Sequence, residues 1–494
     1  MQHLNYLIRS ALCLLLPALL AFSSTSTLCA QELFFERIYE EGLAQASFVI
    51  GDKSTGTAIV IDPKRDMDTY LEIAKANKLK ITHVTETHIH ADFLTGTREL
   101  AAATGATILL SDEGGKDWQY DFPHQGLKDG DRFQIGKLEF EVVHTPGHTP
   151  ESITFLLKDP KPGKPLIALT GDFIFVGDVG RPDLLEKAAG QAGTQEAGAR
   201  QMYASIQKFA ALPDETLIWP GHGAGSFCGK SLSSAPSSTL GQEKKENKAF
   251  HFANNEDGFV KYILDGQPEP PRYFATMKKL NRVQRPLLME VPKYRKLSPD
   301  AFAKAQQKGM PVIDSRSKAK FEKGFLPGSL IVEGNKSFST WMGSLVNYDK
   351  PFLLIADDAE LDQITRKLMR IGMDNAYGYI AQPQDLSNNL QKVEVIDMEQ
   401  FKDITKKDNV QILDVRRTGE FAAGHIAGAD NIALASLDQN LSRIDKNKEV
   451  VIYCQTGVRA AIAYSILKMN GYQNVKSYVG GMKEWTDSGN EIVR

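Results

Sequence analysis

The chain has 494 residues, of which 42% are hydrophobic and 24% charged, and it contains four cysteines. This length exceeds what one hydrophobic core serves, so we expect roughly two to four domains of ordinary globular composition. The formal net charge of −3 shows no basic excess, which argues against nucleic acid as a partner.

Residues 1–30 differ in kind from the rest of the chain. Arg9 lies in a short polar start, residues 11–22 are almost wholly apolar, and small polar residues follow. This order predicts a cleavable signal peptide and an exported, periplasmic protein, because the apolar run is too short to span a bilayer. An uncleaved anchor is the alternative. Lipid attachment through Cys29 fits less well, because the bulky Leu28 precedes it. No membrane span is expected in the mature chain.

Residues 31–265 alternate short β-rich runs with helical ones, which predicts a first α/β domain. Residues 47–51 and 57–61 flank a glycine-containing turn and predict a hairpin. Residues 66–77 and 97–104 carry the spacing of apolar side chains that is typical of amphipathic helices.

Histidines and aspartates follow four predicted strands of this domain. The stretch Thr-His-Ile-His-Ala-Asp-Phe at residues 87–93 follows a β-branched run at 81–87, and the strands at 138–143, 166–170 and 217–219 also end near such residues. Strand ends are where α/β sheets place their ligands, and histidine with carboxylate is a metal-binding combination. The candidates are His88, His90, Asp92, His148, Asp172 and His222.

Together these stretches resemble the metallo-β-lactamase superfamily, whose fold is an αββα sandwich with metal ligands on loops along one edge of two packed sheets. Phe93 departs from the family pattern. Binuclear zinc hydrolases of the superfamily, such as glyoxalase II, carry a histidine there for the second metal. A benzyl side chain cannot ligate a cation, so one metal ion per chain is expected.

The same positions are similar to those of persulfide dioxygenases. This resemblance implies a single Fe(II) held by His88, His148 and Asp172, a set that leaves coordination positions open. It places His90 and Asp92 beside the metal or on the substrate side. Spacing alone leaves direct ligation by His90 open.

Two further residues of the domain are candidates for other roles. Arg181, in a loop that resembles bacterial persulfide dioxygenases, is expected to hold an anionic substrate group by paired hydrogen bonds. The alternative is an arginine tied to Asp178 or Asp183. Cys228 is expected to be a packed small residue rather than a nucleophile, since no base stands beside it in the sequence.

The remaining chain repeats itself after a proline-dense linker at residues 266–295. The segment Val-Ile-Asp-Ser-Arg at 312–316 corresponds to Ile-Leu-Asp-Val-Arg at 412–416. Similarity at a fixed offset indicates duplicated units, which we place at 296–392 and 393–494. Each alternates strands and helices, which predicts a small parallel sheet covered on both faces.

Both units resemble rhodanese domains, and the second has the sulfur-carrying loop. Cys454-Gln-Thr-Gly457-Val-Arg459 joins a buried strand to a helix, so its backbone N–H groups can converge on an anion. The resemblance implies that Cys454 carries sulfane sulfur and that Gly457 and Arg459 bind substrate. Ala356 occupies the cysteine position of the first unit, which is therefore expected to be degenerate.

The resemblance covers nearly all of the mature chain and implies a persulfide dioxygenase fused to tandem rhodanese domains. Such an enzyme oxidises a low-molecular-weight persulfide, typically glutathione persulfide, with O₂ to sulfite, and moves sulfane sulfur between persulfide, sulfite and thiosulfate. Its role would be sulfide detoxification. The alternatives are a glyoxalase II-like zinc thioester hydrolase with a rhodanese module, and a sulfur-carrier protein that does not oxidise. A homo-oligomer stays open.

Overall fold

The computed structural model describes residues 33–158, 165–189, 193–386 and 389–494. The expected signal peptide lies outside these residues, so export stays a prediction. Within the described part, no helix combines the length and the apolar character that a membrane crossing requires.

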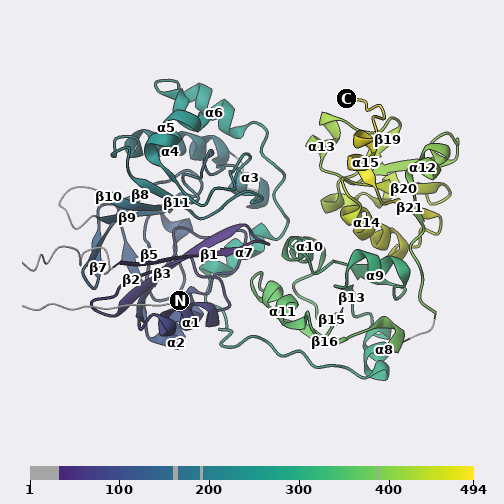
Figure 1. Cartoon of the computed structure of the whole chain (residues 1–494), viewed down its shortest axis with the longest axis horizontal. Coiled ribbons are helices and arrows are strands. Elements are labelled where there is room, and N and C mark those ends of the chain that lie inside the picture. The colour runs from purple at the N-terminus through teal and green to yellow at the C-terminus, as the bar shows by residue number, and fades with distance from the viewer. Residues whose placement is uncertain (1–32, 159–164, 190–192, 387–388) are drawn as a thin grey trace, which may run out of the picture.

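Two six-stranded sheets face each other in the N-terminal part of the chain (Figure 1). Their strand orders are β1-β2-β3-β4-β5-β6 and β12-β11-β10-β9-β8-β7. The strands are β1 (Leu33–Glu40), β2 (Gln45–Asp52), β3 (Thr57–Ile61), β4 (Lys80–Thr85), β5 (Thr107–Ser111), β6 (Gln125–Leu127), β7 (Arg132–Ile135), β8 (Leu138–His144), β9 (Ile153–Lys158), β10 (Pro165–Gly171), β11 (Leu217–Pro220) and β12 (Ser238–Thr239).

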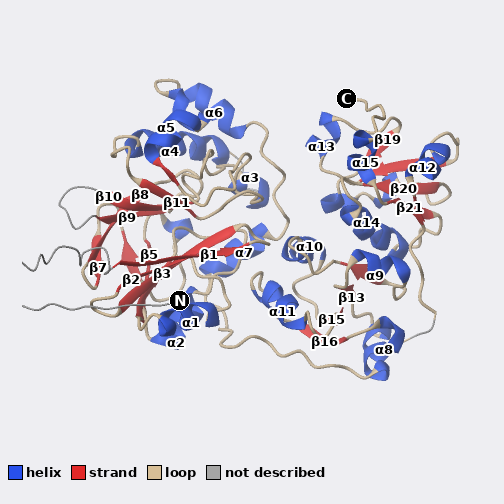
Figure 2. Ribbon diagram, viewed as in Figure 1, coloured by secondary structure: helices blue, strands red, loops and turns tan. Residues whose placement is uncertain are grey.

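Helices cover the outer faces of these sheets, which gives the expected αββα sandwich (Figure 2). Side chains alternate along β2, so Phe48 lies in the core between the sheets, whereas its neighbour Val49 packs with Tyr70 of α1. On the second sheet, Leu156 packs with Ile206 of α4. The helices of this part of the chain are α1 (Asp68–Ala76), α2 (Thr97–Thr104), α3 (Leu184–Ala189), α4 (Thr194–Phe209), α5 (Leu240–Glu246), α6 (Glu256–Leu264) and α7 (Phe274–Arg282).

Two smaller α/β units follow, each built on a parallel sheet. The first has the order β14-β13-β15-β16 and the second β17-β21-β20-β18-β19. Their elements are α8 (Pro299–Gln307), β13 (Val312–Asp314), α9 (Lys318–Lys323), β14 (Ser329–Ile331), α10 (Phe338–Leu345), β15 (Phe352–Ile355), α11 (Leu361–Met369), β16 (Ala376–Ile380), β17 (Val395–Ile396), α12 (Met398–Ile404), β18 (Val410–Asp414), α13 (Thr418–Ala423), β19 (Ala429–Asn431), β20 (Glu449–Tyr453), α14 (Val458–Met469), β21 (Val475–Tyr478) and α15 (Gly481–Asp487).

The two units share a local hydrogen-bond arrangement where the sequence repeats. Arg316 donates to both carboxylate oxygens of Asp314 and to the carbonyl of Gly324. One hundred residues later, Arg416 makes the same bonds to Asp414 and Gly424. In each unit a buried guanidinium therefore fixes the turn that follows β13 or β18.

The sandwich and the two small units pack against one another through a shared apolar cluster. One apolar cluster contains Phe93 of the sandwich, Tyr273 of the linker region, Phe338 of the first unit and Leu434 of the second. Ion pairs reinforce this contact. Arg272 pairs with Asp438 of the second unit at 2.7 Å, and Arg370 of the first unit reaches back to the sandwich.

Candidate metal centre and cysteine loop

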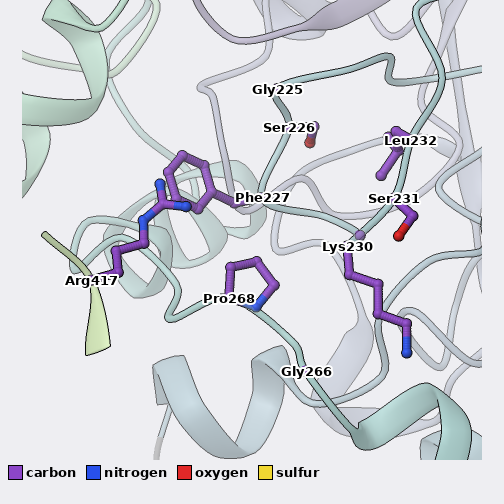
Figure 3. Close-up of a pocket in the computed structure, with 10 residues that line it drawn as sticks. Gly225, Ser226, Phe227, Lys230, Ser231, Leu232, Gly266, Pro268 and Arg417 are labelled. Atoms are coloured by element: carbon purple, nitrogen blue, oxygen red, sulfur yellow. The ribbon is translucent and has the colours of Figure 1, made fainter. Parts of the chain in front are cut away.

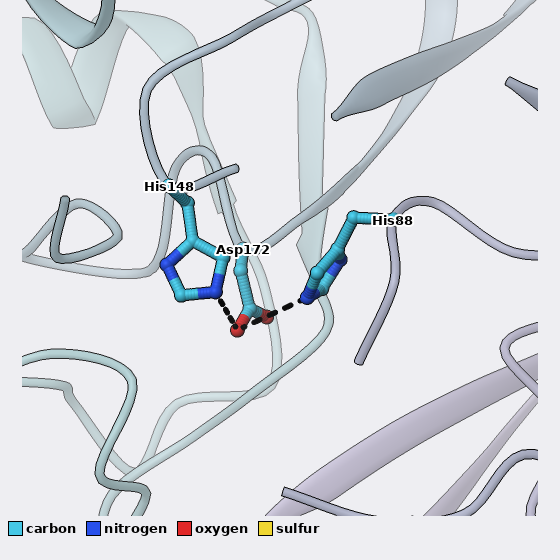
Figure 4. Close-up of side chains that lie close together, drawn as sticks. All are labelled: His88, His148 and Asp172. Carbon is cyan, nitrogen blue, oxygen red and sulfur yellow. Dashed lines mark ion pairs between the residues drawn. The ribbon is translucent and has the colours of Figure 1, made fainter. Parts of the chain in front are cut away.

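Three buried side chains converge at one edge of the sandwich (Figure 4). His88 follows β4, His148 follows β8 and Asp172 follows β10. The Oδ2 atom of Asp172 lies 3.4 Å from Nε2 of His148 and 3.7 Å from Nε2 of His88. One ligand atom from each residue lies within 4.8 Å of the others. The three residues expected to hold the metal are thus brought together.

The hydrogen bonds of the two histidines fix which nitrogen is free. The hydroxyl of Thr87 donates to Asp62 at 2.9 Å, so its oxygen accepts from Nδ1 of His88 at 3.1 Å. Nδ1 of His148 donates to the backbone carbonyl of Arg181 at 2.9 Å. Both rings therefore present an Nε2 lone pair to the centre, the arrangement that oriented metal-binding histidines adopt.

The protonation states also suit a cation. Burial, with the nearby charge of His90, lowers the pKa of His88 well below its ordinary value, and burial lowers the pKa of His148. Burial alone would raise the pKa of Asp172, but His222 and His88 hold that pKa well below its ordinary range. Two neutral imidazoles thus face an ionised carboxylate.

Two buried atoms of this group have no hydrogen-bond partner among the described residues. They are Nε2 of His88 and Oδ2 of Asp172. Leaving buried polar atoms unpaired is costly, and a bound divalent ion would remove that cost. The set of two histidines and one carboxylate fits non-haem Fe(II). The residues present therefore fit the expected metal.

His90 points to a different partner. Its Nε2 atom bonds Oδ1 of Asp62 at 3.0 Å, and its Nδ1 atom, which has no hydrogen bond, lies 3.9 Å from Oδ1 of Asp92. Although burial alone would lower it, Asp62 raises the pKa of His90 to about 9. The same Asp62 carboxylate accepts the backbone N–H of Thr87. Strand β4 ends at Thr85, two residues before the end that the sequence predicts.

His222 joins two carboxylates at the centre. Its Nδ1 atom donates to Asp172 at 2.7 Å and its Nε2 atom donates to Asp92 at 2.8 Å. Burial alone would lower the pKa of His222, but these two carboxylates raise it well above its ordinary value. His222 therefore bears a proton on each nitrogen and neutralises charge beside the candidate ligands.

Cys228 lies at the same centre, which the sequence did not reveal. Its thiol groups with Asp92 and His222, with ligand atoms within 4.8 Å of one another. Burial, together with Asp172 and Asp92, raises the pKa of this thiol well above its ordinary value. The expected packed cysteine is buried, but it packs against the metal-binding loops. Its spacing of six residues after His222 is the one sequence signal that could have placed it there.

Helix α7 clamps the loop that contains the histidines. The hydroxyl of Tyr273 donates to the carbonyl of Asp92 at 2.9 Å, and the amide of Asn281 donates to the carbonyls of His90 and Phe93 at 2.8 Å each. The Phe93 ring is fully buried 4.5 Å from the His90 ring. Phe93 thus fills the apolar core that the sandwich shares with the smaller units.

Arg181 does not have the role expected from the sequence. Its guanidinium donates to both oxygens of Asp183 at 2.6 and 2.7 Å, and its remaining nitrogen donates to the carbonyls of Phe227 and Pro268. The side chain is fully buried. Four of its five N–H groups are therefore bonded within the protein, and Asp183 balances its charge. This arrangement matches the alternative raised from the sequence, in which Arg181 is tied to Asp183, and not the expected contact with a substrate anion.

The second expected site lies in the last unit, where β20 ends at Tyr453. Cys454 is buried, and its Sγ atom accepts the backbone N–H of Gly457 at 3.1 Å. Gly457 has a φ of +85°, and a Cβ atom there would meet the carbonyl oxygen of Val479 at 2.7 Å. Only glycine therefore allows this N–H group to point at the sulfur.

The charges around Cys454 differ from the expected arrangement. Arg459 is bound at both terminal nitrogens by Glu420, at 2.6 and 2.8 Å, so its charge is already balanced. A lysine of the first unit approaches instead. The ammonium nitrogen of Lys318 lies beside Gly457, 3.0 Å from the position that a Cβ atom would take there. Lys318 also forms an ion pair with Glu322 at 3.5 Å. The cysteine loop thus faces a cation from the neighbouring unit.

The corresponding loop of the first unit has a different chemistry. Ala356 follows β15 where the second unit has Cys454. The next two residues form ion pairs, Asp357 with Lys320 and Asp358 with Lys296. No thiol is present there to carry sulfur.

Two family models match the chain. The metallo-beta-lactamase superfamily matches residues 41–222, and the rhodanese-like domain matches residues 397–488. The second match contains Cys454, Gly457 and Arg459, and the first contains all three candidate ligands.

Curated relatives of the sandwich include a persulfide dioxygenase and a hydrolase. Persulfide dioxygenase ETHE1 of Mus musculus is 30% identical over 197 residues, which are 38% of this chain and 68% of the relative. Hydroxyacylglutathione hydrolase of Rhodospirillum rubrum is 32% identical over 175 residues, which are 35% of this chain and 60% of the relative.

A solved structure shares more of the chain. It is a metallo-beta-lactamase from Staphylococcus aureus, 42% identical, with a TM-score of 0.66, and the match covers 70% of this chain and 99% of that one. The likeness therefore extends well beyond the residues that the superfamily model matches.

Proposed function

Because the chain belongs to the metallo-β-lactamase superfamily and carries a rhodanese-like domain, we propose that it oxidises a low-molecular-weight persulfide to sulfite at one Fe(II) ion and transfers sulfane sulfur at Cys454. The persulfide, O₂ and one water give the free thiol, sulfite and two protons. The sulfur atoms lose the four electrons that reduce O₂. Sulfite then takes sulfur from the Cys454 persulfide to give thiosulfate and the thiolate.

The observation that carries this proposal is the three-ligand set beside Phe93. His88, His148 and Asp172 present one free ligand atom each, and the position of a second-metal ligand is an aromatic ring. Bound Fe(II) would supply the one-electron chemistry that lets O₂ react with sulfur.

The chain's own residues define what reaches that site. The rings of Phe93 and Phe175 pack near His90 and His222 and exclude water from this side of the centre. His222 donates its two ring protons to Asp172 and Asp92, so the positive charge of its ring offsets part of the charge of these carboxylates. An anionic sulfur atom would therefore be repelled less by the two acids. Thr87 and the carbonyl of Arg181 keep the two ligand rings oriented.

In the last unit, the residues act on a sulfur anion. The N–H group of Gly457 stabilises a thiolate or persulfide on Cys454, and the ammonium of Lys318 adds an opposite charge. The first unit then serves as a structural partner that supplies this lysine.

The test is metal content together with oxygen uptake. Full-length protein, purified without air and reconstituted with Fe(II), should bind one iron per chain and consume O₂ on glutathione persulfide with matching sulfite release. Two tightly bound zinc ions per chain together with rapid thioester cleavage would instead support the hydrolase, the activity named for the Rhodospirillum rubrum relative. Absence of both activities with intact sulfur transfer would support a sulfur-carrier protein.

We also propose that residues 1–30 are removed on export. The apolar run in the leader supports this. Sequencing the N-terminus of protein from the periplasmic fraction would test it, since an intact Met1 would contradict cleavage.

A further inference from the structure

A cavity of about 290 Å³ lies where the sandwich meets the last unit (Figure 3). Its lining comes from the segment at residues 225–232, from Gly266 and Pro268, and from Arg417, which precedes α13. Cys228 belongs to the same segment but does not line the cavity, and its thiol lies with Asp92 and His222. One loop thus separates this cavity from the metal centre.

The guanidinium of Arg417 has no ion pair in the part of the chain that the structure describes. It lies 4.5 Å over the ring of Phe227. Figure 3 shows the two side chains next to each other at the cavity. The nearest acid, Glu420, accepts the backbone N–H of Arg417, but both of its oxygens bind the side chain of Arg459. Arg417 is exposed and a guanidinium keeps its charge at physiological pH, so this charge is available to a ligand.

The rest of the lining is also suited to an anion. The ammonium of Lys230 donates to the neutral carbonyls of Tyr262 and Asp265 and lies 4.0 Å over the Tyr262 ring, so its charge is not balanced by a carboxylate in an ion pair among the described residues. The carboxylate of Asp178, which lies beside the segment, already accepts the backbone N–H groups of Lys230 and Ser231. Ser226 accepts the N–H of Cys228 through its oxygen, so its hydroxyl proton is free to donate.

We propose that this cavity is an oxyanion-binding pocket in which Arg417 makes the charged contact. The inference rests on the proposed function for the identity of the anion. Two sources share this chemistry: sulfite moving from the metal centre towards Cys454, and a carboxylate of the thiol that carries the persulfide. Arg417 is three residues before Glu420, the partner of Arg459 in the cysteine loop. The pocket therefore lies between the metal centre and the cysteine loop. The last unit contributes residues to the pocket and to the cysteine loop.

Direct binding tests the pocket without turnover. Full-length protein with Cys454→Ser is titrated calorimetrically with sulfite and, separately, with reduced glutathione. Arg417→Gln should weaken the binding of at least one of them roughly tenfold or more, since a bond to a charged group is lost. Arg417→Lys keeps the charge and should retain part of the affinity. The matched control is Arg443→Gln, an exposed arginine of the same unit, which should change neither constant.

The outcomes separate the sources and the two proposals. Loss of sulfite binding alone assigns the pocket to sulfite in transit, and loss of glutathione binding alone assigns it to the carrier thiol. Unchanged binding of both anions in Arg417→Gln, with thermal unfolding like that of the parent, overturns the pocket. Oxygen uptake by the protein without substitutions is measured in parallel. Absence of oxygen uptake would contradict the proposed function, whereas the titration of Arg417→Gln tests the pocket independently of turnover.

Discussion

The guanidinium of Arg370 donates to both carboxylate oxygens of Asp66, which lies 304 residues earlier in the chain, at 3.0 and 2.5 Å. Both side chains are buried, so this pair links the first small unit to the sandwich through a contact that water does not screen. The backbone carbonyl of Arg370 also accepts the N–H of Leu94, two residues after Asp92. The first unit is thereby tied to the loop of the metal centre.

Replacing Arg370 by methionine should destabilise this contact strongly. Asp66 would stay buried and lose both hydrogen bonds from Arg370, keeping only the longer ion pairs with Lys64 at 3.5 Å and Arg366 at 3.6 Å. Breaking comparable buried pairs costs up to roughly 3–5 kcal/mol. Denaturant unfolding would measure the loss. The control is Lys320→Met, which removes an exposed ion pair with Asp357 and should cost less than about 1 kcal/mol. Equal effects of the two substitutions would show that the Arg370 pair does not hold the units together.

Acid should weaken the same contact. Burial alone would raise the pKa of Asp66, but the hydrogen bonds and charge of Arg370 hold it below its ordinary value of 3.8. A carboxyl group with a lowered pKa contributes stability above its unfolded pKa, and this stability is lost as the pH falls through the folded pKa. The loss should therefore begin below about pH 4. Small-angle scattering across this range should show the units separating, and an unchanged profile at acid pH would contradict the prediction.

His148→Ala should remove iron binding and oxygen uptake while sulfur transfer from thiosulfate persists, because the ligand is lost from one centre and Cys454 is in another unit. His144→Ala is the control, since its ring bonds the carbonyl of Pro150 outside the candidate ligand set. Iron content and both activities are measured on each variant. Loss of sulfur transfer in His148→Ala, or retention of oxygen uptake, would refute the assigned roles.

Phe93→His should restore a ligand for a second ion. The new imidazole would lie beside Asp92 and His222, and His222 would release one of its two protons on binding the metal. Zinc reconstitution should therefore raise the metal content from one ion per chain to two. Oxygen uptake should fall. Phe93→Leu keeps the position apolar and should stay at one ion per chain. If the histidine variant also binds one ion while remaining folded, the ring is not what excludes the second metal.

Lys318→Met should raise the KM for thiosulfate in sulfur transfer. The lysine is partly exposed, so water screens its charge, and we expect roughly a threefold change that shrinks as salt is added. The activity of Cys454 towards a neutral sulfur donor should change little. Lys320→Met on the same helix is the comparison. An identical KM in both variants at low salt would remove Lys318 from the cysteine loop's function.

Local pattern carried much of the prediction. The hairpin of β2 and β3 and the helices α1 and α2 lie within a few residues of their expected bounds, because periodic burial sets such elements. The candidate ligands were also readable, since each follows a strand and strand ends meet at one edge of a sheet. The sequence motif indicated that Gly457 belongs to the cysteine loop. Its positive φ explains why glycine is needed there, because few other residues adopt that conformation.

Long-range contacts decided the rest. Arg181 and Arg459 looked like free cations in the sequence, but Asp183 and Glu420 bind them in the folded chain. The side chain of Asn281 donates to the carbonyl of His90, which lies 191 residues earlier in the chain. The loop that contains Cys228 folds so that its thiol lies beside Asp92 and His222. The sequence by itself determined which side chains can bind metal or carry sulfur, because that is a property of residue type and local spacing. Only the tertiary structure decided which charges are already paired and which remain for a ligand, because a partner's distance depends on how separate segments pack.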